Sequence, residues 1–104
     1  MWTDVCALDD IVPDSGVCAL IDGEQVAIVR AADDVYAISN FDPFSKAFVL
    51  SRGIVGDRGG VAKIASPVYK HSFALASGVC LDDDAVRIPV WPARVRRGRI
   101  EVLR

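Results

Sequence analysis

Short apolar runs alternate with turn residues along the chain, and they are clearest in residues 17–21, 25–30 and 35–38. The first two runs are separated by Asp22-Gly23-Glu24, and the next pair by residues 32–34. Asp-Gly favours a tight hairpin because both residues tolerate positive φ. No stretch shows a long apolar stripe at helical spacing. The pattern therefore predicts an all-β fold containing an antiparallel meander of three strands.

The remaining runs are shorter and predict further strands on both sides of this meander. Residues 2–6 lead into a loop or a single helical turn, and the later candidates are residues 54–55, 61–65, 72–75, 86–90, 93–95 and 100–103. Arg97-Gly98-Arg99 is a plausible tight turn before the last strand. Periodicity alone is compatible with either a sandwich or a barrel.

Two proline-containing loops stand out between the strands, Asn40–Phe44 and Ser66–Tyr69. Proline fixes φ near −65° and removes a backbone donor, so Pro43 and Pro67 each constrain the shape of a loop tip. The spacing Asp42-x-Phe44 followed by Ser66-x-x-Tyr69 resembles the Cys-x-His and Cys-x-x-His motifs of Rieske-type ferredoxins. The resemblance implies one domain over residues 1–104, an antiparallel β-sandwich with a small loop-bearing subdomain inserted at residues 39–75.

All four ligand positions of a Rieske centre are changed in this chain. Asp42 and Ser66 offer hard oxygen donors and Phe44 offers no donor atom, so we expect no [2Fe–2S] cluster and no metal here. Phe44 and Tyr69 are large enough to fill part of the vacated volume. Asp42 and Ser66 are expected to hydrogen-bond to each other or to the loop backbone. The site is therefore predicted to be structural, with no catalytic residue.

The surrounding sequence is similar to the small subunit of NAD(P)H-dependent assimilatory nitrite reductase over nearly the whole chain, notably at residues 37–40, 50–53 and 73–78. The resemblance implies a cofactor-free cytoplasmic subunit that binds and stabilises a large catalytic subunit. The large subunit would carry FAD, sirohaem and an iron–sulfur cluster and reduce nitrite to ammonium. The isolated small chain is predicted to be non-catalytic.

Two alternatives belong to other classes of protein. A Rieske-type electron carrier would need the missing ligands. The second alternative is a free-standing interaction module or a thiol-based redox protein. A redox protein would use Cys6, Cys18 or Cys80, but these three cysteines are widely spaced and form no C-x-x-C pair. We expect them to be small buried hydrophobic residues.

Charge and hydropathy narrow the range of partners. The net charge of −2 and the pI near 5.2 argue against nucleic acid, although several arginines gather near the C-terminus. Those arginines favour a solvated strand face over a docking patch. No basic-then-apolar leader opens the chain, and no apolar run reaches the roughly 20 residues that span a bilayer. We therefore expect a cytoplasmic protein without membrane contact.

Aromatic residues are dense around the first loop, with Phe41, Phe44 and Phe48 in or just after it. They either close a small core in the subdomain or leave an exposed anchor for a partner. Phe41, Phe48 and His71 are accordingly the candidate docking residues. His71 otherwise reads as a solvated loop histidine, because Lys70 beside it disfavours a bound cation.

Overall fold

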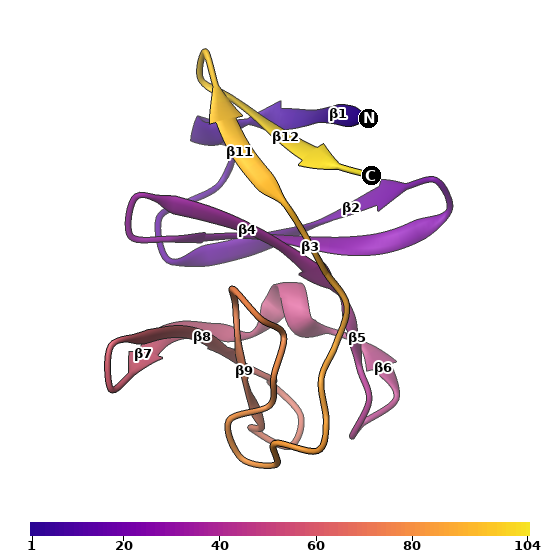
Figure 1. Ribbon diagram of the computed structural model, residues 1–104, viewed down its shortest axis with the longest axis vertical. Helices are drawn as coiled ribbons and strands as arrows, with labels where there is room; N and C mark the ends of the chain where they lie inside the picture. The colour runs from indigo at the N-terminus through magenta and orange to yellow at the C-terminus, as the bar shows by residue number, and fades with distance from the viewer.

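The computed structural model describes all of residues 1–104 and is built from strands with two single helical turns (Figure 1). The strands are β1 (Trp2–Ala7), β2 (Ser15–Ile21), β3 (Glu24–Ala31), β4 (Asp34–Ser39), β5 (Phe41–Asp42), β6 (Ala47–Phe48), β7 (Ile54–Arg58), β8 (Val61–Ala65), β9 (Ser72–Ala74), β10 (Val90–Trp91), β11 (Ala93–Arg96) and β12 (Arg99–Leu103), with 3-10 turns η1 (Leu8–Asp10) and η2 (Leu50–Arg52). This confirms the all-β prediction. None of its helical turns has the length and apolar character needed to cross a membrane.

The main body is an antiparallel sandwich of two sheets. One sheet has the order β10-β4-β3-β2 and the other β1-β12-β11, so the first and last strands of the chain pair with each other. The predicted meander is β2-β3-β4. Asp22 and Gly23 join β2 to β3 with φ of 50° and 81°, which are the angles of a two-residue hairpin turn.

Strand β3 is the centre of the molecule because both of its faces are buried. Val26 and Ile28 point into the sandwich and pack with Ile100 and Val102 of β12. Ala27 and Val29 point the other way, into a second core shared with the subdomain. A strand buried on both faces is apolar at consecutive positions, as residues 26–29 are.

The subdomain lies on the second face of β3 and β4 (Figure 1). It contains the sheet β7-β8-β9, the short hairpin β5-β6 and turn η2, and it is inserted between β4 and β10. Residues 76–88 also belong to it, since Ile88 N–H donates to the Gly78 carbonyl and Ile88 lies in the second core. The strand predicted over 86–90 is therefore wrong for most of its length, and only Val90 and Trp91 form β10.

Candidate functional site

The two loops singled out in the sequence meet through one buried hydrogen bond. Asp42 ends β5, Ser66 follows β8, and the Ser66 hydroxyl donates to Asp42 Oδ2 over 2.6 Å. Asp42 is 0% exposed and Ser66 1% exposed. The two positions that match cysteine ligands in the Rieske pattern are thus joined directly, side chain to side chain.

Further hydrogen bonds fix the Asp42 carboxylate within its own loop. Oδ1 accepts from the backbone N–H of Phe44 at 3.0 Å, and Oδ2 also accepts from the Ser45 hydroxyl at 2.8 Å. Burial raises the pKa of the Asp42 carboxyl, but the hydrogen bonds from the serine hydroxyls and loop N–H groups outweigh it and hold that pKa below its ordinary value. Asp42 therefore remains ionised at neutral pH and acts as a charged acceptor between the loops.

An aromatic stack also joins the two loops. The rings of Phe44 and His71 are parallel, with centroids 3.7 Å apart and an interplanar angle of 4°, and Phe44 also contacts Phe73 in the core at 6.1 Å. His71 is half-buried, and its Nδ1 is buried without a hydrogen-bond partner. The expectation of a solvated loop histidine is therefore wrong, because the ring belongs to the packing between the loops.

Tyr69 does not fill the space between the loops, and that prediction is wrong. It is 62% exposed at the tip of the second loop, beside Val68 at 45%. The Lys70 N–H donates back to the Ser66 carbonyl at 3.1 Å, which closes a tight turn with residues 67–69 at its outer side. The ring that stacks on Phe44 between the loops is that of His71.

Phe41 and Phe48 form a separate pair across β5 and β6. Their ring centroids are 5.1 Å apart, and Phe48 is 54% exposed while Phe41 is half-buried. They line a groove of about 440 Å³ together with Leu20, which is 73% exposed. Phe48 therefore closes no internal core and lies on the surface.

The donor chemistry at the loops does not fit a [2Fe–2S] cluster. Rieske centres use two thiolates and two imidazoles, whereas the matching positions hold a carboxylate, a hydroxyl, a phenyl ring and an exposed phenol. The carboxylate and the hydroxyl are also engaged with each other. No step of chemistry through such a cluster can be assigned to this chain.

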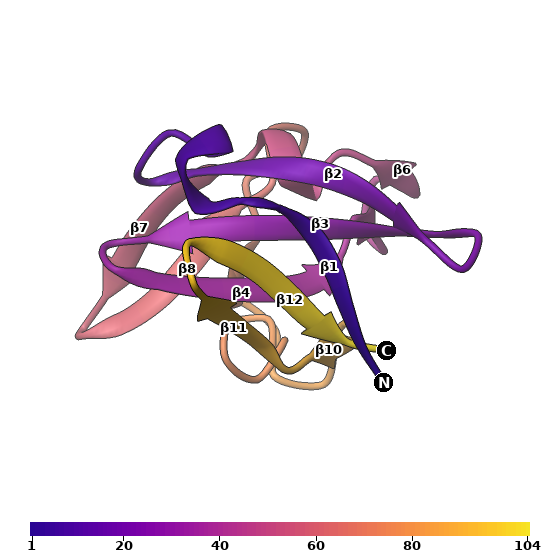
Figure 2. The same cartoon turned by 90° about the horizontal axis from the view of Figure 1, so that it is seen from above.

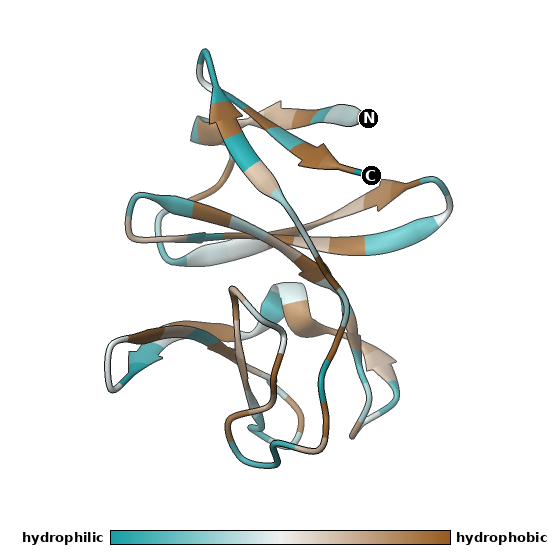
Figure 3. Ribbon diagram, viewed as in Figure 1, coloured by the Kyte–Doolittle hydropathy of each residue, from teal (hydrophilic) through white to brown (hydrophobic).

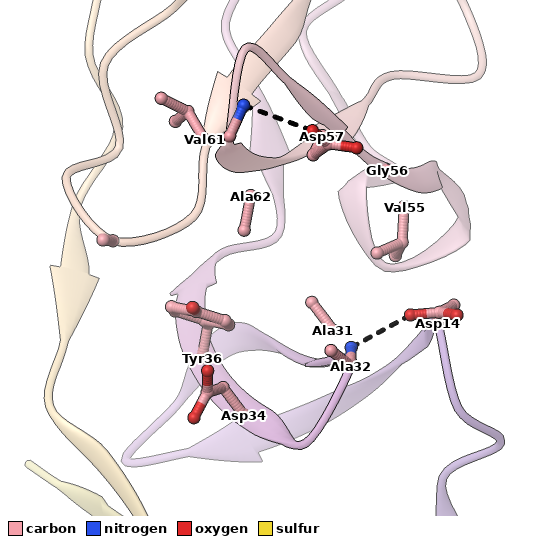
Figure 4. Close-up of a pocket in the computed structure, with 12 residues that line it drawn as sticks. Asp14, Ala31, Ala32, Asp34, Tyr36, Val55, Gly56, Asp57, Val61 and Ala62 are labelled. Atoms are coloured by element: carbon pink, nitrogen blue, oxygen red, sulfur yellow. Dashed lines mark hydrogen bonds between the residues drawn. The ribbon is translucent and has the colours of Figure 1, made fainter.

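The geometry also gives Ser66 no means of nucleophilic catalysis. It is buried from substrate, and the lowered pKa of Asp42 makes that carboxylate a poor base. The larger cavity, about 600 Å³, lies between the β3-β4 turn and the β7-β8 hairpin (Figure 4) and is lined by none of the loop residues. Its Asp14 accepts from Ala32 N–H and its Asp57 from Gly60 N–H, so these carboxylates stabilise turns.

The three cysteines lie in different environments and are all free thiols. Cys80 is buried as expected, Cys6 is half-buried and Cys18 is exposed, so the expectation of burial is wrong for Cys18. Burial, followed by the nearby Asp10 carboxylate, raises the pKa of the Cys6 thiol. A raised pKa lowers the thiolate fraction and so disfavours redox chemistry at Cys6.

Comparisons with known proteins identify the family. Residues 1–103 match the model of the Rieske-like [2Fe-2S] domain. The chain is 45% identical over 103 residues to the nitrite reductase (NADH) small subunit of Escherichia coli K12, covering 97% of this chain and 95% of the relative. A crystal structure from Mycobacterium tuberculosis, described as an NADH-dependent nitrite reductase small subunit, superposes with a TM-score of 0.95 at 55% identity, covering 100% of this chain and 95% of that one.

In a third relative, the segment that resembles this chain is part of a longer protein. The nitrite reductase [NAD(P)H] large subunit of Klebsiella oxytoca is 39% identical over 101 residues, which is 97% of this chain and 11% of that protein. A segment like this chain is therefore part of a much longer polypeptide there. Together with the loop geometry, these likenesses show that the chain belongs to the nitrite reductase small-subunit family, within the Rieske-like domains.

Proposed function

We propose that this chain is the cofactor-free small subunit of a cytoplasmic nitrite reductase, and that it acts by binding and stabilising a large catalytic subunit. The enzyme takes electrons from NADH or NADPH and reduces nitrite to ammonium in nitrate assimilation. FAD, sirohaem and an iron–sulfur cluster belong to the large subunit. The isolated small chain catalyses nothing by itself.

The observation that carries the partner assignment is the Klebsiella oxytoca relative. A 101-residue segment 39% identical to this chain accounts for 11% of that large subunit. Two proteins that occur separately in one organism and as one polypeptide in another usually contact each other. The small chain would then supply from outside a domain that the longer protein contains within itself.

The absence of a resident cluster is supported by the Asp42–Ser66 pair. A thiolate-bound cluster joins two loops through the metal, and here a 2.6 Å hydrogen bond to an ionised carboxylate joins them instead. The parallel stack of Phe44 on His71 adds apolar contact to the same junction. Both contacts join the loops through protein groups, which supports a fold that is stable without iron.

Co-expression tests this proposal. The large subunit is produced with and without this chain, and nitrite-dependent oxidation of NADH and of NADPH is measured at equal large-subunit concentration, together with its thermal inactivation rate. We expect higher activity or slower inactivation when the small chain is present, and co-elution of the two chains. The purified small chain should contain no stoichiometric iron. Equal activity, equal inactivation and separate elution would refute the proposal.

A further inference from the structure

Strand β2 is the one long sheet edge of this molecule that carries no protection against pairing. Free edges in soluble proteins are normally blocked by charges, prolines, bulges or shortness. Four other edges follow this rule. Strand β1 has a register shift and the charged Asp4, and β7 carries the charged residues Asp57 and Arg58. Strand β11 has two arginines after Pro92, and β10 is only two residues long and lies between prolines. The seven residues of β2, Ser-Gly-Val-Cys-Ala-Leu-Ile, include no charge and no proline.

The outer edge of β2 is unpaired and regular. Its only strand partner is β3, and the register runs from Ser15 to Ile21 without a shift. Because Ile21 and Glu24 close a two-residue hairpin, they form a hydrogen-bonded pair, and the N–H groups of Gly16, Cys18 and Leu20 then point away from β3. The N–H groups of Gly16, Cys18 and Leu20 donate to no other element. Seen from above, β2 lies at the outside of its sheet (Figure 2).

Apolar surface flanks this edge on both sides. On one side Leu20, Phe41 and Phe48 form the apolar part of the 440 Å³ groove, whose remaining lining is mostly polar and comes from residues 22–25 and Ser39. On the other side, Val17 and Ala19 line a groove of about 340 Å³ between β2 and β1. Figure 3 shows the end of β2 as hydrophobic and the turn after it as hydrophilic. An added strand would therefore find backbone partners at the edge and an apolar surface for its alternate side chains.

We infer that the free edge of β2 receives an extended strand of the large catalytic subunit, uncharged in its middle, which adds to the sheet beside β2. This rests on the proposed function. Both ends of the neutral edge are acidic. Asp14 precedes β2, and after β2 the carboxylates of Asp22 and Glu24 share a single cation, the Arg104 guanidinium, at 3.4 and 2.6 Å. The complementary strand has an apolar middle and basic residues near its ends.

The same charges disfavour a second copy of this chain as the occupant. The antiparallel self-pairing that overlaps all seven residues places Cys18 opposite Cys18. It then brings Asp14 of one copy near Asp22 of the other at both ends of the pair, where the single Arg104 cation offsets only one of the two carboxylates of Asp22 and Glu24. Like charges opposite each other destabilise strand pairing. Large-subunit binding and self-association therefore make different predictions for the same residues.

The test measures binding of the purified full chain to the separately purified large subunit by isothermal titration calorimetry. Leu20→Lys introduces a charge at the free edge on a side chain that is already in solvent, so folding is kept. Ile54→Lys is the matched control, because Ile54 is 65% exposed and the charge change is equal. We expect the dissociation constant to rise at least tenfold for Leu20→Lys and less than twofold for Ile54→Lys.

A second variant and an exchange measurement address the backbone directly. Cys18→Pro removes an outward N–H and leaves the ladder to β3 intact, because proline is tolerated on an edge strand when its nitrogen faces solvent. This variant should also weaken binding to the large subunit at least tenfold. Hydrogen exchange at Gly16, Cys18 and Leu20 should slow on adding the large subunit. If the wild type binds but both variants bind as tightly, or the three amides are unchanged, the inference is wrong while the proposed function stands. If the wild type does not bind the large subunit, the proposed function itself fails. If the chain forms a dimer that Leu20→Lys abolishes, the edge of β2 serves self-association instead.

Discussion

The hydrogen bond between Asp42 and Ser66 leads to the sharpest prediction about stability, because it alone joins the two loops through polar side chains. Asp42→Ala removes an acceptor from the Ser66 hydroxyl, the Ser45 hydroxyl and the Phe44 N–H. Losing three hydrogen bonds to a charged acceptor, at roughly 1.5 kcal/mol each, costs about 3–5 kcal/mol. Ser66→Ala removes the hydrogen bond to this charged group and the longer one that Ser66 Oγ accepts from Val68 N–H at 3.3 Å, and it should cost about 1.5–3 kcal/mol.

The two substitutions should not add. Once Asp42 is gone, the Ser66 hydroxyl is a buried donor without an acceptor, and removing it then costs only the 3.3 Å bond that it accepts from Val68 N–H. We expect the double variant to be less destabilised than the sum of the single ones by about 1–2 kcal/mol, within the range for directly contacting residues. Ser45→Ala is the matched control, since it loses the same kind of bond to Asp42 Oδ2 but its hydroxyl is half-buried and lies in the same loop as Asp42. It should cost under about 1 kcal/mol.

Urea unfolding followed by circular dichroism measures these differences. With a slope of about 1–3 kcal/mol per molar urea, a loss of 3 kcal/mol moves the midpoint by about 1 M or more. The iron content of each sample is measured alongside. A coupling energy indistinguishable from zero between Asp42 and Ser66, or a Ser45→Ala variant as unstable as Ser66→Ala, would contradict the view that this pair replaces the link between the loops.

Three further predictions concern the same junction. The pKa of Asp42 is lower in the folded state, so this carboxylate stabilises the fold above the ordinary carboxyl pKa, and the stabilisation is lost as pH falls through the folded-state pKa. The difference in free energy of unfolding between wild type and Asp42→Asn should therefore shrink between about pH 5 and pH 2. A difference that stays constant over this range would contradict the prediction. Phe44→Ala should lower the free energy of unfolding by about 2–4 kcal/mol, whereas Tyr69→Ala should change it by less than about 0.5 kcal/mol, as urea midpoints will show. Chelation with EDTA should leave the melting temperature unchanged, and a drop of several degrees would indicate a structural metal.

Much of the fold follows from short-range sequence signals. The hairpin of β2 and β3 depends on Asp22-Gly23, whose positive φ values are a local property of those residues. The turn at Arg97-Gly98 between β11 and β12 was predictable for the same reason, with φ of 53° and 74°. The mismatch between the loop residues and a Rieske ligand set is likewise visible in the sequence, since it depends only on which atoms the side chains offer.

The occupant of the space between the loops was not predictable in this way. Tyr69 matches a ligand position by spacing, yet His71, two residues later, stacks on Phe44. The choice depends on the turn closed by Lys70 and Ser66 and on where β8 and β9 hold the second loop against the first. No signal within the loop itself distinguishes the two aromatic rings.

The sequence by itself determined most of the strands, the tight turns and the loss of the iron ligands, because each depends on neighbouring residues or on side-chain chemistry. Only the tertiary structure decided that His71 rather than Tyr69 packs on Phe44, that Phe48 and Cys18 are exposed, and that the edge of β2 is free. Exposure and pairing are set by which distant segments come to lie side by side. An apolar strand has the same sequence pattern whether or not another strand lies beside it.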